Sequence, residues 1–238
     1  MNSRICIMIS EKIKQELNNL ACKKNAEIYS NFFKSRKGEY GEGDKFIGVT
    51  VPEQRKIAKK YMHAPLMDLV ELVSSGIHEH RLTGFIILTY QFEKYPEQRK
   101  NIFNFYVKYH KYANNWDIID VTAPRIIGQY LLDNNKSLLY KYAKSKNMWE
   151  KRISIVSTMA FIYNNKFDDT IKISEILLHD KHDLIHKAVG WMLRETGKRD
   201  VKVLETFLKK YSRVMPRTML RYSIEKFSKE MRKEYLMK

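Results

Sequence analysis

Cysteine, proline and glycine are scarce in this chain of 238 residues, which has two, five and nine of them respectively. The two cysteines, Cys6 and Cys22, are too few for a disulfide scaffold and lack zinc-site spacing, which suits a reducing cytoplasm. Few glycines and prolines, with few alternating apolar and polar stretches, argue against a β-rich fold and favour an all-helical one. No uncharged stretch reaches the roughly 20 residues of a membrane-spanning helix. We therefore expect a soluble, helical, cytoplasmic protein.

Negative charge is also in short supply. The chain has 44 Lys and Arg against 27 Asp and Glu, a formal net charge of +17. Residues 181–238 alone hold 16 basic and 7 acidic residues. A basic excess of this size favours a polyanionic partner, with nucleic acid ahead of a membrane surface or an acidic protein.

Apolar residues recur at three- and four-residue spacings from Ile13 onward, and the predicted helices pair into a repeat. Second helices are predicted to start near Glu79, Asn115, Trp149, His182 and Arg217, at intervals of 36, 34, 33 and 35 residues. First helices are predicted over 66–74, 97–110, 137–144, 168–178 and 201–211. Two helices in about 35 residues are typical of an α-solenoid, and the tetratricopeptide pattern is missing, which favours HEAT-like pairs. We predict an all-α superhelix forming one domain over 1–238, with regular repeats over about 65–238 and a concave basic groove.

The N-terminal part, about 1–64, is less regular. One helix is predicted from Ser10 to Lys34, followed by a loop over 37–48 that holds four of the nine glycines. The loop has neither of the common nucleotide-binding glycine patterns and is either a plain connection or the approach to a phosphate site. In the second case, a helix opening with Pro52 in its first position would present free N–H groups to a phosphate, assisted by Arg55.

Each of the three tryptophans has charged neighbours, in the segments 116–120, 149–152 and 187–194. Trp116 and Asp120 are four residues apart, so on one helix they share a side. Pro124 lacks the N–H that would bond the Asp120 carbonyl, which favours a kink that turns the carboxylate into a groove. Alternatively, an acid here only offsets the helix dipole, which suits Asp117 better than Asp120.

The helix predicted from His182 has one apolar face, made by Leu184, Ile185, Ala188, Val189, Met192 and Leu193. Trp191 falls on the other side with Lys187 and Arg194, so it is either covered by the next repeat or an aromatic platform flanked by cations. Arg152 falls within an apolar sector. It could extend its charged end to water, pair with an acid of a neighbouring helix, or reach toward Asp120 or a phosphate.

Other basic residues and the histidines complete the set of candidates. Arg217 and Arg221 are four apart and share a helix side with basic character. The histidines have no metal-ligand pattern, so solvated or helix-capping roles are expected, with no metal and no cofactor. We expect Lys187, Arg194, Arg55, Arg217 and Arg221 to contact the phosphates of a nucleic acid.

Four strings of this sequence resemble the DNA alkylation repair family, whose best-known members are the AlkD-like HEAT-repeat DNA glycosylases. They are Phe46–Pro52, Asn115–Pro124, Trp149–Arg152 and Lys187–Glu195, and the resemblance runs from about Ser10 to the end of the chain. It implies excision of cationic N3- and N7-alkylated purines from duplex DNA without deep base flipping. By motif, the family's carboxylate, two tryptophans and arginine correspond to Asp120, Trp116, Trp191 and Arg152.

The resemblance leaves a second function open. Some relatives only bind unusual DNA structures, so the chain is either a glycosylase or a non-catalytic HEAT-repeat protein that binds damaged or unusual DNA. A protein-binding solenoid fits the net charge of +17 less well. In each DNA-binding case we expect a monomer.

Overall fold

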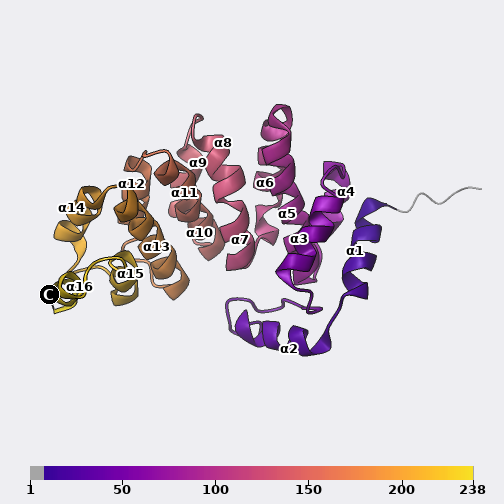
Figure 1. Cartoon of the computed structure of the whole chain (residues 1–238), viewed down its shortest axis with the longest axis horizontal. Coiled ribbons are helices and arrows are strands. Elements are labelled where there is room, and N and C mark those ends of the chain that lie inside the picture. The colour runs from indigo at the N-terminus through magenta and orange to yellow at the C-terminus, as the bar shows by residue number, and fades with distance from the viewer. Residues whose placement is uncertain (1–7, 238) are drawn as a thin grey trace, which may run out of the picture. The chain divides into compact units, whose positions relative to one another are not determined.

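The computed structural model describes residues 8–237, which are helical apart from their connecting loops (Figure 1). Within this range no β-strand forms, and one isolated bridge joins Lys45 to Ile77. None of the helices described is long and apolar enough to cross a membrane. The chain divides into two compact units, one ending at Thr122 and the other beginning at Ala123. The all-α prediction is confirmed, and the helix order is consistent with an α-solenoid.

The first unit is built around one long helix that is buried along most of its length. This helix, α5, packs against α3, α4, α6 and α7. Its segment from Leu82 to Phe92 has no charged residue, as expected of a helix covered on most sides. The helices of this unit are α1 (Ile9–Asn19), α2 (Lys23–Phe32), α3 (Val51–Lys60), α4 (Leu66–Val73), α5 (His78–Lys94), α6 (Arg99–Tyr109) and α7 (Trp116–Thr122), with short 3₁₀ turns η1 (Pro96–Gln98) and η2 (His110–Tyr112).

The second unit is a succession of helix pairs in which α10, α13 and α15 pack on one another in turn. Gly190 of α13 allows a close approach to α15, because a Cβ there would lie 2.5 Å from that of Tyr222 and 2.6 Å from the Met219 carbonyl oxygen. The elements are η3, a π-helix (Pro124–Gly128), then α8 (Gln129–Leu131), α9 (Ser137–Ala143), α10 (Met148–Ser157), α11 (Met159–Tyr163), α12 (Asp168–Ile176), α13 (Asp183–Arg199), α14 (Val201–Tyr211), α15 (Arg217–Ser223) and α16 (Lys229–Met237).

The predicted repeat is confirmed helix by helix. The five second helices, α5, α7, α10, α13 and α15, each begin within one residue of the predicted start. The first helices α4, α6, α9, α12 and α14 occupy the predicted ranges to within two residues at either end. The single domain over 1–238 and the concave basic groove stay predictions.

The N-terminal prediction needs correction, because the expected helix from Ser10 to Lys34 is two helices. The chain leaves the α-conformation between Leu20 and Cys22, where the Cys22 N–H donates to the Ile47 carbonyl at 2.8 Å. Gly48 packs against the same turn, since a Cβ there would lie 2.1 Å from the Cys22 carbonyl oxygen. The glycine-rich loop therefore packs against the break between α1 and α2. Cys22 is a free thiol, and Cys6 lies outside the described residues.

Candidate functional site

Trp116 and Asp120 lie on α7, whose start is fixed by the residue before it. The buried Asn115 accepts the Trp116 N–H through its side-chain oxygen at 2.8 Å, and its amide nitrogen donates to Asp44 at 3.2 Å. Such a side-chain acceptor satisfies an N–H that the first helical turn leaves without a partner. Trp116 therefore begins α7, and Asp120 follows about one turn later on the same side. Both side chains are partly exposed.

The Trp116 ring is held by aromatic residues from the end of α2 and the loop after it. Its ring centroid lies 5.3 Å from that of Phe33 and 5.8 Å from that of Phe32, the latter in an edge-to-face arrangement. Its Nε1–H donates to the Tyr40 hydroxyl at 3.3 Å. Aromatic pairs of this kind stabilise a fixed ring orientation. We call Phe32, Phe33, Tyr40 and Phe46 the aromatic cluster.

A buried ion network lies beside this cluster, and His78 is its centre. Its Nδ1 lies 3.1 Å from Asp44 and its Nε2 lies 2.8 Å from Asp117. Arg81 donates to the second oxygen of Asp44 at 2.5 Å. Burial lowers the pKa of His78, but the carboxylates of Asp117 and Asp44 outweigh this and raise it to about 9. His78 is therefore an imidazolium at neutral pH, with both ring nitrogens donating.

The ion network and the aromatic cluster are in direct contact. The His78 ring lies 5.1 Å from the Phe33 centroid and 4.8 Å from the Phe46 centroid, with interplanar angles of 29° and 30°. The sequence prediction of solvated or capping histidines is wrong for His78, whose side chain is only 2% exposed. Asp117, for which the sequence suggests an offset of the helix dipole, is a partner of His78. Trp116 is thus connected through Phe33 to buried charges on α5.

The chain changes helix type shortly after Asp120. The α-helix ends at Thr122, and the segment from Pro124 is π-helical, with the Gly128 N–H donating to the Ala123 carbonyl at 2.8 Å. Proline cannot supply the N–H that would continue the α-helical ladder. The predicted interruption of the helix after Asp120 is confirmed.

In the second unit, Arg152 of α10 is a buried side chain with a specific partner. It is 5% exposed, and its Nη1–H donates to the Leu184 carbonyl in the first turn of α13 at 2.7 Å. A buried guanidinium needs acceptors of this kind. Of the roles predicted for Arg152, the structure supports burial in the apolar sector with a partner on a neighbouring helix, the Leu184 carbonyl of α13.

Trp191 lies on α13, the helix that Arg152 contacts. The predicted apolar face of this helix is confirmed for Ile185, Ala188, Val189, Met192 and Leu193, which are buried, whereas Leu184 in the first turn is partly exposed. Trp191 is partly exposed, and it makes no hydrogen bond and no ring–ring contact with any residue from 8 to 237. The structure therefore places Trp116 with Asp120 in the first unit, and Arg152 against the helix of Trp191 in the second.

Comparison with known proteins identifies the family. The family model described as DNA alkylation repair enzyme matches residues 13–227. The chain belongs to the DNA alkylation repair family. A solved structure described as a predicted DNA alkylation repair enzyme from Enterococcus faecalis has a similar fold, with a TM-score of 0.69 and 16% identity over 88% of this chain and 97% of that chain. No curated protein sequence matches significantly.

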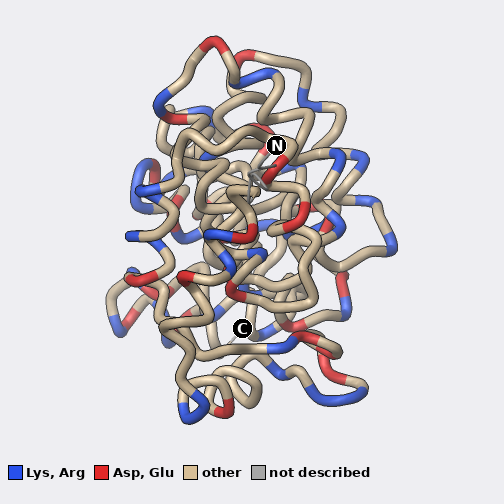
Figure 2. The backbone as a smooth tube through the Cα atoms, turned by 90° about the vertical axis from the view of Figure 1, so that its right-hand side faces the viewer, with Lys and Arg blue, Asp and Glu red and all other residues tan. Residues whose placement is uncertain are grey.

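For a DNA alkylation repair protein, the basic side chains left without acidic partners are of interest, because phosphates bind through them. Lys and Arg are interspersed with Asp and Glu over the backbone (Figure 2). Lys187 pairs with Asp183 at 2.8 Å. Arg194 pairs with Glu225, and with Glu195 at 3.2 Å. These acids reduce the charge that the two predicted contacts present to DNA.

The other three predicted DNA contacts are exposed. Arg217 donates to the Leu236 carbonyl at 2.6 Å, whereas Arg221 makes no hydrogen bond or ion pair with the described part of the chain. Arg55 lies in α3, which begins at Val51 and so one residue before the predicted start.

The start of α3 already holds an acid of its own. The Glu53 carboxylate accepts the Thr50 N–H at 3.2 Å and the Thr50 hydroxyl at 2.8 Å. A carboxylate in this capping position counts against the predicted phosphate at the same helix start. Among residues 8–237 no group of three or more His, Cys, Asp or Glu is placed to hold a metal ion.

Proposed function

We propose that this member of the DNA alkylation repair family is a DNA glycosylase that hydrolyses the N-glycosidic bond of cationic N3- and N7-alkylated purines in duplex DNA. It would act as a cytoplasmic monomer, and it would excise the alkylated base without flipping it deeply into a pocket. The observation that carries the proposal is that Trp116 and Asp120 lie about one turn apart on α7, both partly exposed, in a chain of this family.

The chemistry follows from the charge of the substrate. An alkylated purine already carries a positive charge, so it leaves with the bonding electron pair and needs no general acid. The sugar then becomes an oxocarbenium-like cation, which the Asp120 carboxylate stabilises. Asp120 also positions the water that adds to the sugar carbon and loses its proton, which yields a free base and an abasic site.

The remaining residues act on the sugar and on its flanking phosphate. Trp116 and Trp191 present electron-rich ring faces, which attract a cation within about 6 Å of the ring centroid. The aromatic cluster holds the Trp116 ring before substrate arrives, so little ordering is needed on binding. The family motif assigns a phosphate beside the lesion to Arg152, which is 5% exposed and whose Nη1–H already donates to the Leu184 carbonyl, so its other N–H donors would have to reach that phosphate.

The test is base release from a methylated duplex. The protein is incubated with duplex DNA treated with a methylating agent, and released N3-methyladenine and N7-methylguanine are quantified by chromatography. An untreated duplex and the Asp120→Asn variant are the controls. Release by the wild type alone supports the proposal. Tight duplex binding with no release would instead support a non-catalytic DNA-binding protein.

A further inference from the structure

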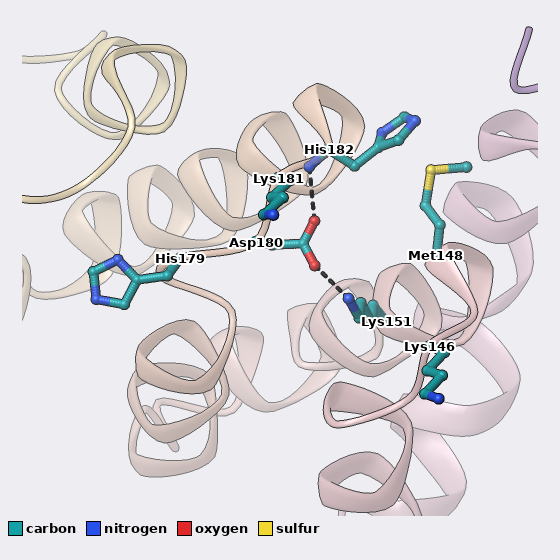
Figure 3. A pocket seen from close by; sticks show the side chains of 7 residues that line it. All are labelled: Lys146, Met148, Lys151, His179, Asp180, Lys181 and His182. Carbon is teal, nitrogen blue, oxygen red and sulfur yellow. Dashed lines mark hydrogen bonds and ion pairs between the residues drawn. The ribbon is translucent and has the colours of Figure 1, made fainter.

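A surface pocket of the second unit is unusually rich in lysine (Figure 3). It has a volume of about 480 Å³ and lies between the start of α10 and the turn that precedes α13. The first element contributes Lys146 and Lys151, and the second contributes Lys181 together with Asp180 and His182. We call this the lysine pocket. None of its residues belongs to the site described above.

The single acid of the pocket is already used within the protein. One oxygen of Asp180 lies 2.5 Å from Lys151 Nζ, and the other accepts the His182 N–H at 2.8 Å. Burial raises the pKa of Asp180, but Lys151 and the His182 N–H outweigh this and lower it, so the group stays ionised. Asp180 thus neutralises Lys151 and holds the two sides of the pocket together, as the dashed lines of Figure 3 mark.

Two cations remain after this pairing. Lys146 and Lys181 are exposed, and neither makes a hydrogen bond or ion pair with residues 8–237. The pocket therefore keeps a charge excess of two. Lys146 and Lys181, two exposed cations near the neutralised Lys151, favour the binding of an external anion.

His182 adds a neutral donor to the two charges. Its Nδ1 accepts the Leu184 N–H at 3.2 Å, and burial lowers the pKa of the ring below its usual 6.5. The neutral ring therefore carries its proton on Nε2, which is a hydrogen-bond donor. Ammonium groups and a ring N–H are the donors that a phosphate oxygen accepts from.

We propose that the lysine pocket binds the phosphodiester backbone of duplex DNA. The inference rests on the proposed function, because it takes DNA as the partner. The pocket is formed by the same two helix starts that Arg152 joins, since Arg152 follows Lys151 and donates to Leu184 just after His182. A strand that passes the starts of α10 and α13 would meet the lysine pocket, whose phosphate contacts add affinity without reading sequence.

The test removes the two unpaired charges together. The variant Lys146→Gln/Lys181→Gln is titrated with an unmodified fluorescent duplex at several salt concentrations. Each lost phosphate contact lowers the slope of log affinity against log salt by about 1, so the slope should fall by about 2 and the affinity by about tenfold at low salt. Unchanged thermal unfolding would show that both lysines are dispensable for folding.

A matched control separates this site from net charge alone. Lys172→Gln/Lys209→Gln removes two exposed lysines of the same unit, on α12 and α14, outside the pocket. It should change the slope by clearly less than the pocket variant. An equal change in both variants overturns the inference. Inorganic phosphate is the second probe and is added as a competitor of the fluorescent duplex. If phosphate displaced the duplex at a concentration comparable to that of the duplex, the assignment to DNA would be overturned.

The two proposals fail separately. Lysine-dependent duplex binding without base release would contradict the glycosylase assignment and leave the lysine pocket supported. Base release by the wild type together with an unchanged salt slope in the pocket variant would contradict only the lysine pocket.

Discussion

The two tryptophans assigned to the sugar have different surroundings in the two units. Trp116 contacts Phe32 and Phe33 and donates to Tyr40. Trp191 has no aromatic or hydrogen-bonding partner among the described residues, and its neighbour Gly190 is what brings α13 against α15. Side-chain contacts orient the Trp116 ring, whereas no hydrogen bond or ring contact with residues 8–237 orients the Trp191 ring. Substitutions around the two rings should therefore have different consequences for stability and for activity.

The largest effect is expected where Trp116 is connected to buried charge. Asp44→Asn removes the carboxylate shared by His78 and Arg81, whose side chains are 2% and 4% exposed. Leaving buried cations without their acid should lower the free energy of unfolding by about 3–5 kcal/mol. Urea denaturation followed by tryptophan fluorescence measures this.

The second unit offers a matched control for that change. Asp183→Asn removes an acid paired with Lys187, and both side chains are substantially exposed. The free energy of unfolding should change by less than about 1 kcal/mol. Equal losses in the two variants would contradict the contrast between the buried ion network around Asp44 and the exposed ion pair of Asp183.

The next effect concerns rate rather than stability. Asp120→Asn keeps the size of the side chain and removes the charge that stabilises the developing cation, so base release should fall by about a hundred- to a thousandfold, equivalent to about 2.7–4 kcal/mol. Duplex affinity should be retained or increased, because a carboxylate near phosphates opposes binding. Single-turnover base release and fluorescence anisotropy measure the two quantities. Asp133→Asn, at an exposed position of the second unit, is the control, and a similar rate loss there would contradict the assignment.

The stability of the first unit should depend on pH through His78. Its pKa is raised from 6.5 to about 9 in the folded protein, so its contribution is complete below pH 6.5 and is lost as the pH rises through 9. The expected loss between pH 6 and pH 10 is about 3 kcal/mol. Urea denaturation at each pH measures it, and His78→Gln should flatten the dependence. A wild-type stability that increases from pH 7 to pH 9 would rule the mechanism out.

The smallest effects compare the two rings directly. Trp191→Ala should slow base release by an amount equivalent to about 0.5–2 kcal/mol, the usual range of a cation–π contact, with little loss of stability. Trp116→Ala should slow it similarly and also destabilise the fold, since each lost aromatic pair contributes about 0.5–1.5 kcal/mol. Thermal unfolding and base release are measured on both variants. Equal decreases in the unfolding temperature of the two variants would show that the side-chain contacts of Trp116 do not stabilise the fold.

The sequence was sufficient for features that local signals determine. These local signals are the helix periodicity, the residues before each helix and the proline at 124. The five second helices begin within one residue of the positions that these signals predict. The apolar face of α13 followed from its 3.6-residue period for the same reason. The family motifs supplied Asp120, Trp116, Arg152 and Trp191 as candidates, but not their surroundings.

Contacts between distant parts of the chain could not be predicted in this way. His78 meets Asp117 at a separation of 39 residues and Asp44 at 34, and no spacing rule connects them. Arg194 was expected to face a phosphate, yet it pairs with Glu225, 31 residues away. The break between α1 and α2 likewise depends on Ile47, which accepts from Cys22 across the intervening helix and loop.

The position of the aromatic cluster in the chain decides what a usable fragment of this protein is. Phe33, Tyr40 and Asp44 all precede α3, the first helix after the irregular N-terminal loop. A fragment that began at α3 would keep Trp116 and Asp120 but would strip one face of the indole and leave His78 and Arg81 without Asp44. The segment outside the regular repeats is thus part of the folded first unit. An N-terminally truncated variant should therefore begin before α1.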